Sequence, residues 1–124
     1  MPGNFCDEVS WKERALALRD SVELFRGKWK FCILKNLAPG SMRFTDLQKK
    51  IKISPKVLSR ELQDLELNML ITRTVKQTKP ATVEYSITEY ARETWQVMQA
   101  LILFGEKHRN KIKERLKANK RQKS

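Results

Sequence analysis

The chain has 124 residues, of which 40% are hydrophobic and 32% are charged, and its formal net charge is +12 with a sequence pI near 10.0. This length supports one domain with a modest core, and the longest apolar run, Ala100–Phe104, is far too short to span a bilayer. The excess of positive charge predicts a polyanionic partner, which is DNA, RNA or an acidic membrane surface.

The N-terminus, residues 1–9, is polar and is expected to be flexible. It lacks the apolar stretch of a secretory signal. Its Cys6 and the only other cysteine, Cys32, do not make a disulfide framework. Together these features predict a cytoplasmic protein in a reducing environment.

Two helices are predicted next. Ser10 and Glu13 have the spacing of a capping box, which predicts that the first helix starts at Ser10. Gly27 is expected to end that helix or its turn. A second helix is predicted from about Lys28 to Leu37, where the following Pro39-Gly40 stops it.

A helix-turn-helix follows a short extended piece at Met42-Arg43-Phe44. Thr45–Gln48 resembles another capping box and predicts a third helix from Thr45 to about Ile51. Ser54 as N-cap and Pro55 at the first helical position predict a fourth helix to about Leu67, with Asn68 as its left-handed C-terminal residue. About three residues join the two helices, which is helix-turn-helix spacing.

The fourth helix has two distinct faces. Its apolar stripe has a period of 3.6 residues, and its opposite stripe is polar. The apolar members are Leu58, Leu62, Leu65 and Met69, and the polar ones are Lys56, Ser59, Arg60 and Gln63. Such a helix can rest on its domain while its polar side chains reach base edges in the major groove. The alternative is the ordinary solvated face of an amphipathic surface helix.

Two alternating segments come next, at Ile71–Val75 and Val83–Ile87, and they predict a β-hairpin around a loop at Lys76–Thr82. A basic hairpin directly after a recognition helix indicates a wing. Lys76 and Lys79 would then reach the DNA backbone or the minor groove. The alternative for Lys79 is a solvated hairpin tip.

Thr88 is expected to cap one long final helix from about Glu89. This helix and the first one both carry wide apolar stripes, which predicts a homodimer interface. The interface residues expected are Trp11, Leu18, Val22, Trp95, Met98 and Ile102. The alternative is that the two helices pack on each other within one chain. Beyond Gly105 the tail holds nine basic and two acidic residues, and Ile112 and Leu116 indicate a helix that continues and then frays.

From Gly27 to Gly105 the chain resembles HxlR-type winged helices, a branch related to the MarR-like regulators. The matching pieces are Gly27–Lys30 with Ile33-Leu34, Gly40 with Arg43–Leu47, Ile53–Ser59, Leu62–Glu66 and Val83–Thr88. The resemblance implies a bacterial or archaeal transcription factor that binds operator DNA as a homodimer. The chain departs from the family in having Met69 where a Gly is usual, and in having Asp7, not Pro, after Cys6.

The sequence therefore predicts a mostly helical α+β fold: a winged helix-turn-helix with N- and C-terminal dimerisation helices. We expect the domain at 10–105 and a basic tail at 106–124. The expected DNA-binding residues are Arg43, Thr45, Ser54, Lys56, Ser59, Arg60, Gln63, Lys76 and Lys79, and Cys6 is the candidate redox residue.

An enzyme, a metal site and a cofactor are not expected. His108 is the only histidine, the two cysteines lack zinc spacing, and no Gly-rich phosphate loop is present. The predicted partners are double-stranded DNA and a second copy of the chain, without a membrane. Sequence-specific operator binding is the preferred function. The alternative is a winged-helix module that binds RNA or proteins, with nonspecific affinity for nucleic acid.

Overall fold

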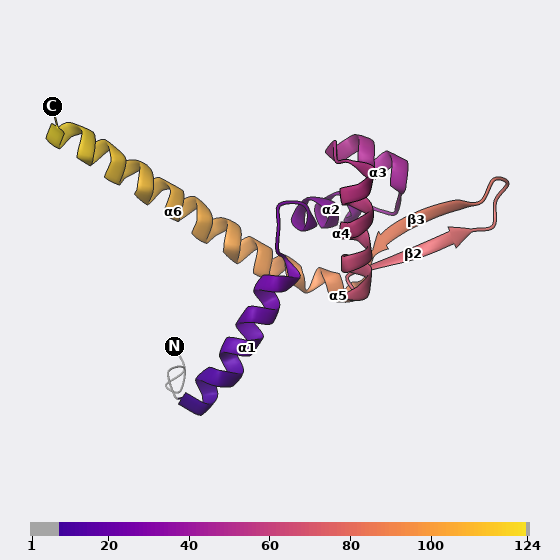
Figure 1. Ribbon diagram of the computed structural model, residues 1–124, viewed down its shortest axis with the longest axis horizontal. Helices are drawn as coiled ribbons and strands as arrows, with labels where there is room; N and C mark the ends of the chain where they lie inside the picture. The colour runs from indigo at the N-terminus through magenta and orange to yellow at the C-terminus, as the bar shows by residue number, and fades with distance from the viewer. Residues whose placement is uncertain (1–7, 124) are drawn as a thin grey trace. The chain divides into compact units, whose positions relative to one another are not determined.

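The computed structural model describes residues 8–123, which divide into two compact units after Thr88 (Figure 1). The first unit holds four helices and a three-stranded sheet, and the second is helical. This arrangement confirms a mostly helical α+β fold with a winged helix-turn-helix.

Helix α1 spans Glu8–Leu24, so the predicted start at Ser10 is wrong, and Ser10 lies inside the helix. Gly27 has φ +89°, a conformation that few other residues adopt readily, and it separates α1 from α2 at Lys30–Leu37. The ring of Phe25, directly after α1, stacks on the ring of Phe31 in α2, with the ring centroids 4.9 Å apart.

Helix α3 spans Phe44–Ile51 and begins earlier than the predicted Thr45 cap. Strand β1, Met42–Arg43, pairs with a later strand and holds the chain extended up to Arg43, so the helix starts directly after it. The predicted cap of helix α4, Pro55–Leu67, is confirmed. The amide of Val57 donates to the Ser54 hydroxyl at 3.3 Å, and Pro55 lies at the first helical position.

The left-handed residue after α4 is Met69, with φ +64°, and not the predicted Asn68, whose φ is −87°. Two hydrogen bonds explain the difference. The Leu70 amide donates to the Leu65 carbonyl, and the Met69 amide donates to the Glu66 carbonyl, both at 3.0 Å. This pair defines a Schellman motif, which places the left-handed residue one position after the cap.

The sheet has the order β1-β3-β2, with β2 at Ile71–Lys76 and β3 at Thr82–Ile87. Both pairings are antiparallel, and Lys76 lies opposite Thr82 at the loop end of the hairpin. Figure 1 shows β2 and β3 extending from the helices of the first unit as a two-stranded wing. The predicted hairpin is confirmed.

The core of the first unit lies between its helices and the start of the wing. Its fully buried side chains come from α2, α3, α4, the turn after α4 and the start of β2, and they are Ile33, Leu34, Leu37, Leu47, Leu58, Leu62, Leu65, Leu70 and Ile71. Nine aliphatic side chains without a polar atom fix the angle between α3 and α4 by shape, since close-packed interiors resist rearrangement.

The second unit consists of α5, Glu89–Arg92, and α6, Thr94–Lys123, so the single final helix predicted from the sequence is interrupted at Glu93. The Thr94 hydroxyl donates to the Ala91 carbonyl at 2.6 Å across this interruption. Helix α6 continues through Gly105 and does not fray before Lys123, because its end is rich in strong helix formers such as Lys, Arg, Ala and Gln.

Candidate nucleic-acid interface

Helix α4 presents the polar face that its sequence predicted. Leu58, Leu62 and Leu65 are buried, and all four polar side chains of the opposite stripe are exposed: Lys56, Ser59, Arg60 and Gln63. Met69 does not extend the buried stripe, since it is 67% exposed. The chain has already left the helix at that point, so the helical period no longer determines where Met69 lies.

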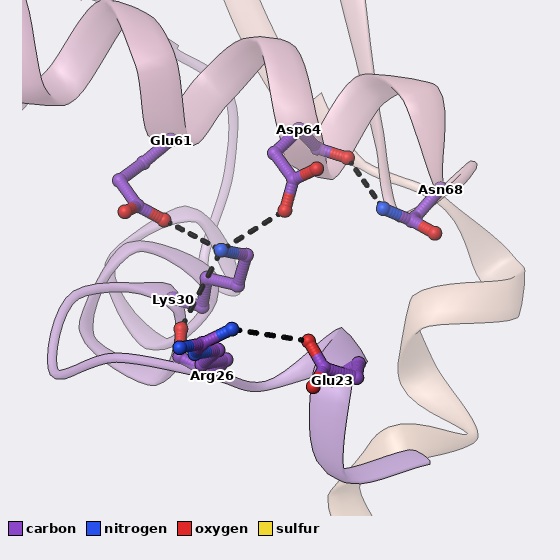
Figure 2. Close-up of polar contacts among 6 residues, drawn as sticks. All are labelled: Glu23, Arg26, Lys30, Glu61, Asp64 and Asn68. Atoms are coloured by element: carbon purple, nitrogen blue, oxygen red, sulfur yellow. Dashed lines mark hydrogen bonds and ion pairs between the residues drawn. The ribbon is translucent and has the colours of Figure 1, made fainter. Parts of the chain in front are cut away.

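A buried lysine joins α2 to α4. Lys30 is only 8% exposed in its side chain, and its Nζ lies 2.8 Å from Glu61 Oε2 and 3.0 Å from Asp64 Oδ2 (Figure 2). It also donates to the Arg26 carbonyl at 3.5 Å. Glu61 and Asp64 are three residues apart on one flank of α4, between its buried stripe and its polar face.

Burial alone would lower the pKa of Lys30, but the hydrogen bonds and charges of Glu61 and Asp64 outweigh it and raise the pKa above its ordinary value. Lys30 therefore stays charged at neutral pH. Because its three polar contacts lie on α4 and on the end of the α1–α2 turn, it restrains how α4 rotates about its own axis.

An open groove of about 440 Å³ runs beside this network, and it is lined by Lys30, Arg60, Glu61, Gln63, Asp64 and Leu67. Two of the exposed polar residues of α4, Arg60 and Gln63, thus border the ion pairs that hold the helix. Figure 2 also shows the side-chain amide of Asn68 donating to the backbone carbonyl of Asp64 at 2.8 Å, at the C-terminal end of α4.

A second ion pair joins β2 and β3 near the loop end of the wing. Lys76 Nζ lies 3.0 Å from Glu84 Oε2, and the Ser41 hydroxyl donates to the same oxygen at 3.3 Å. The hydrogen bond from Lys76 is the main reason that the pKa of Glu84 is lowered, and the charge of Arg43, its neighbour across β1 and β3, contributes. Glu84 therefore pairs with Lys76 and feels the charge of Arg43, and both cations are predicted to contact DNA.

The remaining predicted DNA-binding residues are all exposed. Arg43 and Thr45 lie at the start of α3, Ser54 lies at the start of α4, and Lys79 lies in the loop between β2 and β3. In that loop the Thr78 hydroxyl donates to the Pro80 carbonyl at 2.8 Å. The exposure of Arg43, Thr45, Ser54 and Lys79 is consistent with contact to DNA, and their roles stay predictions.

Cys6 lies outside the described residues. Cys32 is half-buried in α2, where its carbonyl accepts a hydrogen bond from the Asn36 amide at 2.7 Å. Within residues 8–123, no group of three His, Cys, Asp or Glu side chains could hold a metal ion.

Helices α1 and α6 each expose large apolar side chains. On α1, Trp11, Leu18 and Val22 are exposed. On α6, Trp95 and Ile102 are exposed, and Met98 is half-buried. These are the residues predicted for a dimer interface.

Comparison with known proteins identifies the family. The model of the HxlR-like helix-turn-helix family matches residues 24–113, which include both helices of the helix-turn-helix and the whole wing. The chain belongs to the HxlR-like helix-turn-helix family. It is a helix-turn-helix transcriptional regulator and not an enzyme.

Relatives of this HxlR-like protein occur in bacteria and archaea. The chain is 31% identical over 102 residues to YtcD of Bacillus subtilis, an uncharacterised HTH-type transcriptional regulator, and this covers 82% of the chain and 81% of YtcD. It is 33% identical over 100 residues to an HTH-type regulator of Methanothermobacter thermautotrophicus, which covers 80% of the chain and 76% of that protein.

Solved structures of transcriptional regulators also resemble this chain. The crystal structure of ytcD superposes with a TM-score of 0.68 at 33% identity, over 75% of this chain and 96% of that one. The reduced form of the regulator YodB from B. subtilis superposes with a TM-score of 0.67 at 27% identity, over 73% of this chain and 89% of YodB. No helix among residues 8–123 of this HxlR-like chain is long and apolar enough to cross a membrane.

Proposed function

We propose that this HxlR-like regulator binds a pseudo-palindromic operator as a homodimer and reads its sequence with α4. The observation that carries the proposal is the division of α4 into a fully buried aliphatic stripe and an exposed stripe of Lys56, Ser59, Arg60 and Gln63. A helix in the major groove needs both faces. Arg can donate two hydrogen bonds to guanine, and Gln can pair with adenine.

The wing supplies contacts to the DNA backbone in this proposal. Lys76 and Lys79 are exposed on a hairpin that follows α4 in the chain. Lysine donates to phosphate without reading the base, so these residues add affinity and fix the register of the protein on the duplex. Arg43, Thr45 and Ser54, at the starts of α3 and α4, would donate to phosphates in the same way.

Dimerisation through α1 and α6 is supported by their exposed apolar side chains, since soluble monomers avoid large apolar patches. An isologous contact would bury these faces in both copies and close the assembly. It would also set the two recognition helices about 34 Å apart, one turn of DNA, or a small multiple of that distance.

The test is the difference in affinity between a selected duplex and a random one. Preferred duplexes are selected from a random pool, and binding to the best of them is compared with binding to a scrambled sequence at the same salt concentration. Operator reading predicts a gap of at least about 10³-fold. A winged-helix module that binds RNA or other nucleic acid nonspecifically predicts a steep salt dependence and little gap.

Cys6 remains our proposal for a thiol that senses oxidants or electrophiles. Two structures similar to this chain are of YodB in its reduced and its diamide-treated form, which supports testing a thiol here. Operator binding is measured before and after diamide for the wild type and for Cys6→Ser. Loss of binding in the wild type alone supports the role, and equal responses dismiss it.

A further inference from the structure

The end of α6 carries more than half of the net charge of the protein. The basic tail helix, residues 106–123, is helical throughout, and every one of its side chains is exposed. It contains nine basic residues: Lys107, Arg109, Lys111, Lys113, Arg115, Lys117, Lys120, Arg121 and Lys123. Against them stand Glu106 and Glu114, so the segment has a net charge of +7 out of +12. At most two of the nine cations can be neutralised inside the segment.

The basic residues form two rows along the helix. Lys107, Lys111 and Arg115 are four residues apart, and so are Arg109, Lys113 and Lys117. Like charges at this spacing destabilise an isolated helix, by roughly 0.2–0.5 kcal/mol a pair. A polyanion that lies along the helix converts this repulsion into attraction.

Exposed Ile112 and Leu116 lie between the two rows. This narrow apolar seam could suggest pairing with the same segment of a second copy. However, both rows that flank the seam are positive, so two copies would bring like charges together. Insertion into an anionic membrane surface needs a broad apolar face, which two aliphatic side chains do not supply. Charge complementarity therefore favours a partner that presents many phosphates and demands little apolar contact.

We propose that the basic tail helix binds the phosphates of double-stranded DNA independently of sequence, as a second DNA contact beside the helix-turn-helix. The inference rests on the proposed function, since it assumes that DNA is the polyanion this regulator meets. At a rise of 1.5 Å per residue the segment is about 27 Å long, which matches roughly eight base pairs of duplex. The family match ends at residue 113, so much of this contact is additional to the shared domain.

The tail helix and α4 have different effects on DNA binding in this proposal. The tail helix raises affinity for any duplex, whereas α4 determines the ratio between cognate and random DNA. Loss of tail charge should therefore weaken both by the same factor and leave the ratio unchanged.

The experiment compares two double variants of the full chain that lose the same charge. Lys113→Gln with Lys117→Gln removes two cations from one row of the tail, and Gln preserves helix propensity. Lys12→Gln with Lys35→Gln removes two exposed cations from α1 and α2. Binding to a selected duplex and to a random duplex is measured across a series of salt concentrations, with circular dichroism to verify folding.

The tail variant is expected to bind both duplexes roughly 3- to 10-fold more weakly and to reduce the salt slope by about 1 to 2, and the body variant to change neither appreciably. Equal losses in the two variants would overturn the proposal, because net charge alone would then explain the effect. Unchanged DNA binding together with lost binding to phosphatidylserine vesicles would also overturn it and assign the tail to a membrane.

The two proposals can fail separately. If the wild type shows no gap between selected and random DNA but the tail variant loses salt-dependent affinity, the tail contact stands and operator reading falls. If the gap is large and the tail variant behaves like the wild type, operator reading stands and the tail contact falls.

Discussion

Lys30 Nζ lies 2.8 Å from Glu61 Oε2, and this contact ties α2 to the helix that carries the proposed base-reading side chains. Neither residue is among those expected to touch DNA. Arg60 and Gln63 line the same groove and lie on the same helix as Glu61, so we expect the pair to help position them.

Lys30→Met should lower the free energy of unfolding by about 2–4 kcal/mol, because it leaves Glu61, 14% exposed, without its counter-ion. The loss should be smaller than for a fully buried ion pair, because Asp64, the second acid that contacts Lys30, is 44% exposed and water can solvate it. Urea unfolding measures the change. Lys30→Met combined with Glu61→Leu should recover part of the loss, and a double variant less stable than the single one would contradict this account.

The same contact has a defined pH dependence. The pKa of Lys30 is raised in the folded protein, so the stabilisation is fully present below the ordinary lysine value and is lost only as pH rises through the raised pKa. The difference in unfolding free energy between the wild type and Lys30→Met should thus stay constant from about pH 6 to 9. A difference that disappears within that window would mean that Lys30 is not charged.

Met69 occupies a left-handed conformation, with φ +64°, which costs a residue with a Cβ about 1–2 kcal/mol. Met69→Gly should therefore leave the protein as stable or raise its stability by up to about 1 kcal/mol, since the gain is offset by the greater entropy of glycine in the unfolded chain. Met69→Val should destabilise, because β-branched residues tolerate this region poorly. Thermal unfolding is measured for both variants. Equal unfolding midpoints for Met69→Gly and Met69→Val would refute the left-handed conformation of Met69.

Glu84 holds Lys76 in the free protein and lies beside Arg43 in the register of the sheet. Glu84→Gln should release Lys76 and remove the negative charge beside Arg43, and should increase affinity for random duplex by roughly 2- to 5-fold, with a steeper salt dependence. Lys79→Ala removes a positive charge from the wing loop, where Glu84→Gln removes a negative one from the wing. It should reduce the slope of the salt dependence by about 1. Weaker DNA binding by Glu84→Gln would show that the carboxylate positions Lys76 more than it competes with phosphate.

Homodimer formation is tested by sedimentation at low micromolar concentration. Val22→Lys on α1 and Ile102→Lys on α6 each place a charge in the proposed apolar contact, and each should shift the protein toward monomer. Lys12→Gln, an exposed neighbour on α1, is the control and should remain dimeric. A wild type that is monomeric and binds a single half-site with full affinity would rule out the dimer.

The helix-turn-helix and its faces could be predicted because they depend on local signals. Ser54 and Pro55 mark a helix start, and Leu58, Leu62 and Leu65 repeat with the helical period. The family resemblance added the order of the pieces. The wing was predictable in the same way, from two alternating segments on either side of a loop.

Other features could not be predicted because they depend on hydrogen bonds or on contacts distant in sequence. Lys30 and Glu61 are 31 residues apart, and the only hint was the i, i+3 pair of acids on the flank of a helix expected to meet DNA. The left-handed position after α4 was assigned to Asn68 from residue type, whereas the Schellman hydrogen bonds determine that it is Met69. The contact of Lys76 with Glu84 needed the strand register, which a loop of uncertain length does not define.

The most direct test of sequence reading by α4 is the binding of Arg60→Ala to the selected operator and to its set of single-base variants, with Lys35→Ala on α2 as the control. We predict a loss of about 1–3 kcal/mol on the selected operator, with discrimination relaxed at one base position and retained at the others. A uniform loss across all the variants, or no loss, would contradict base reading by this helix.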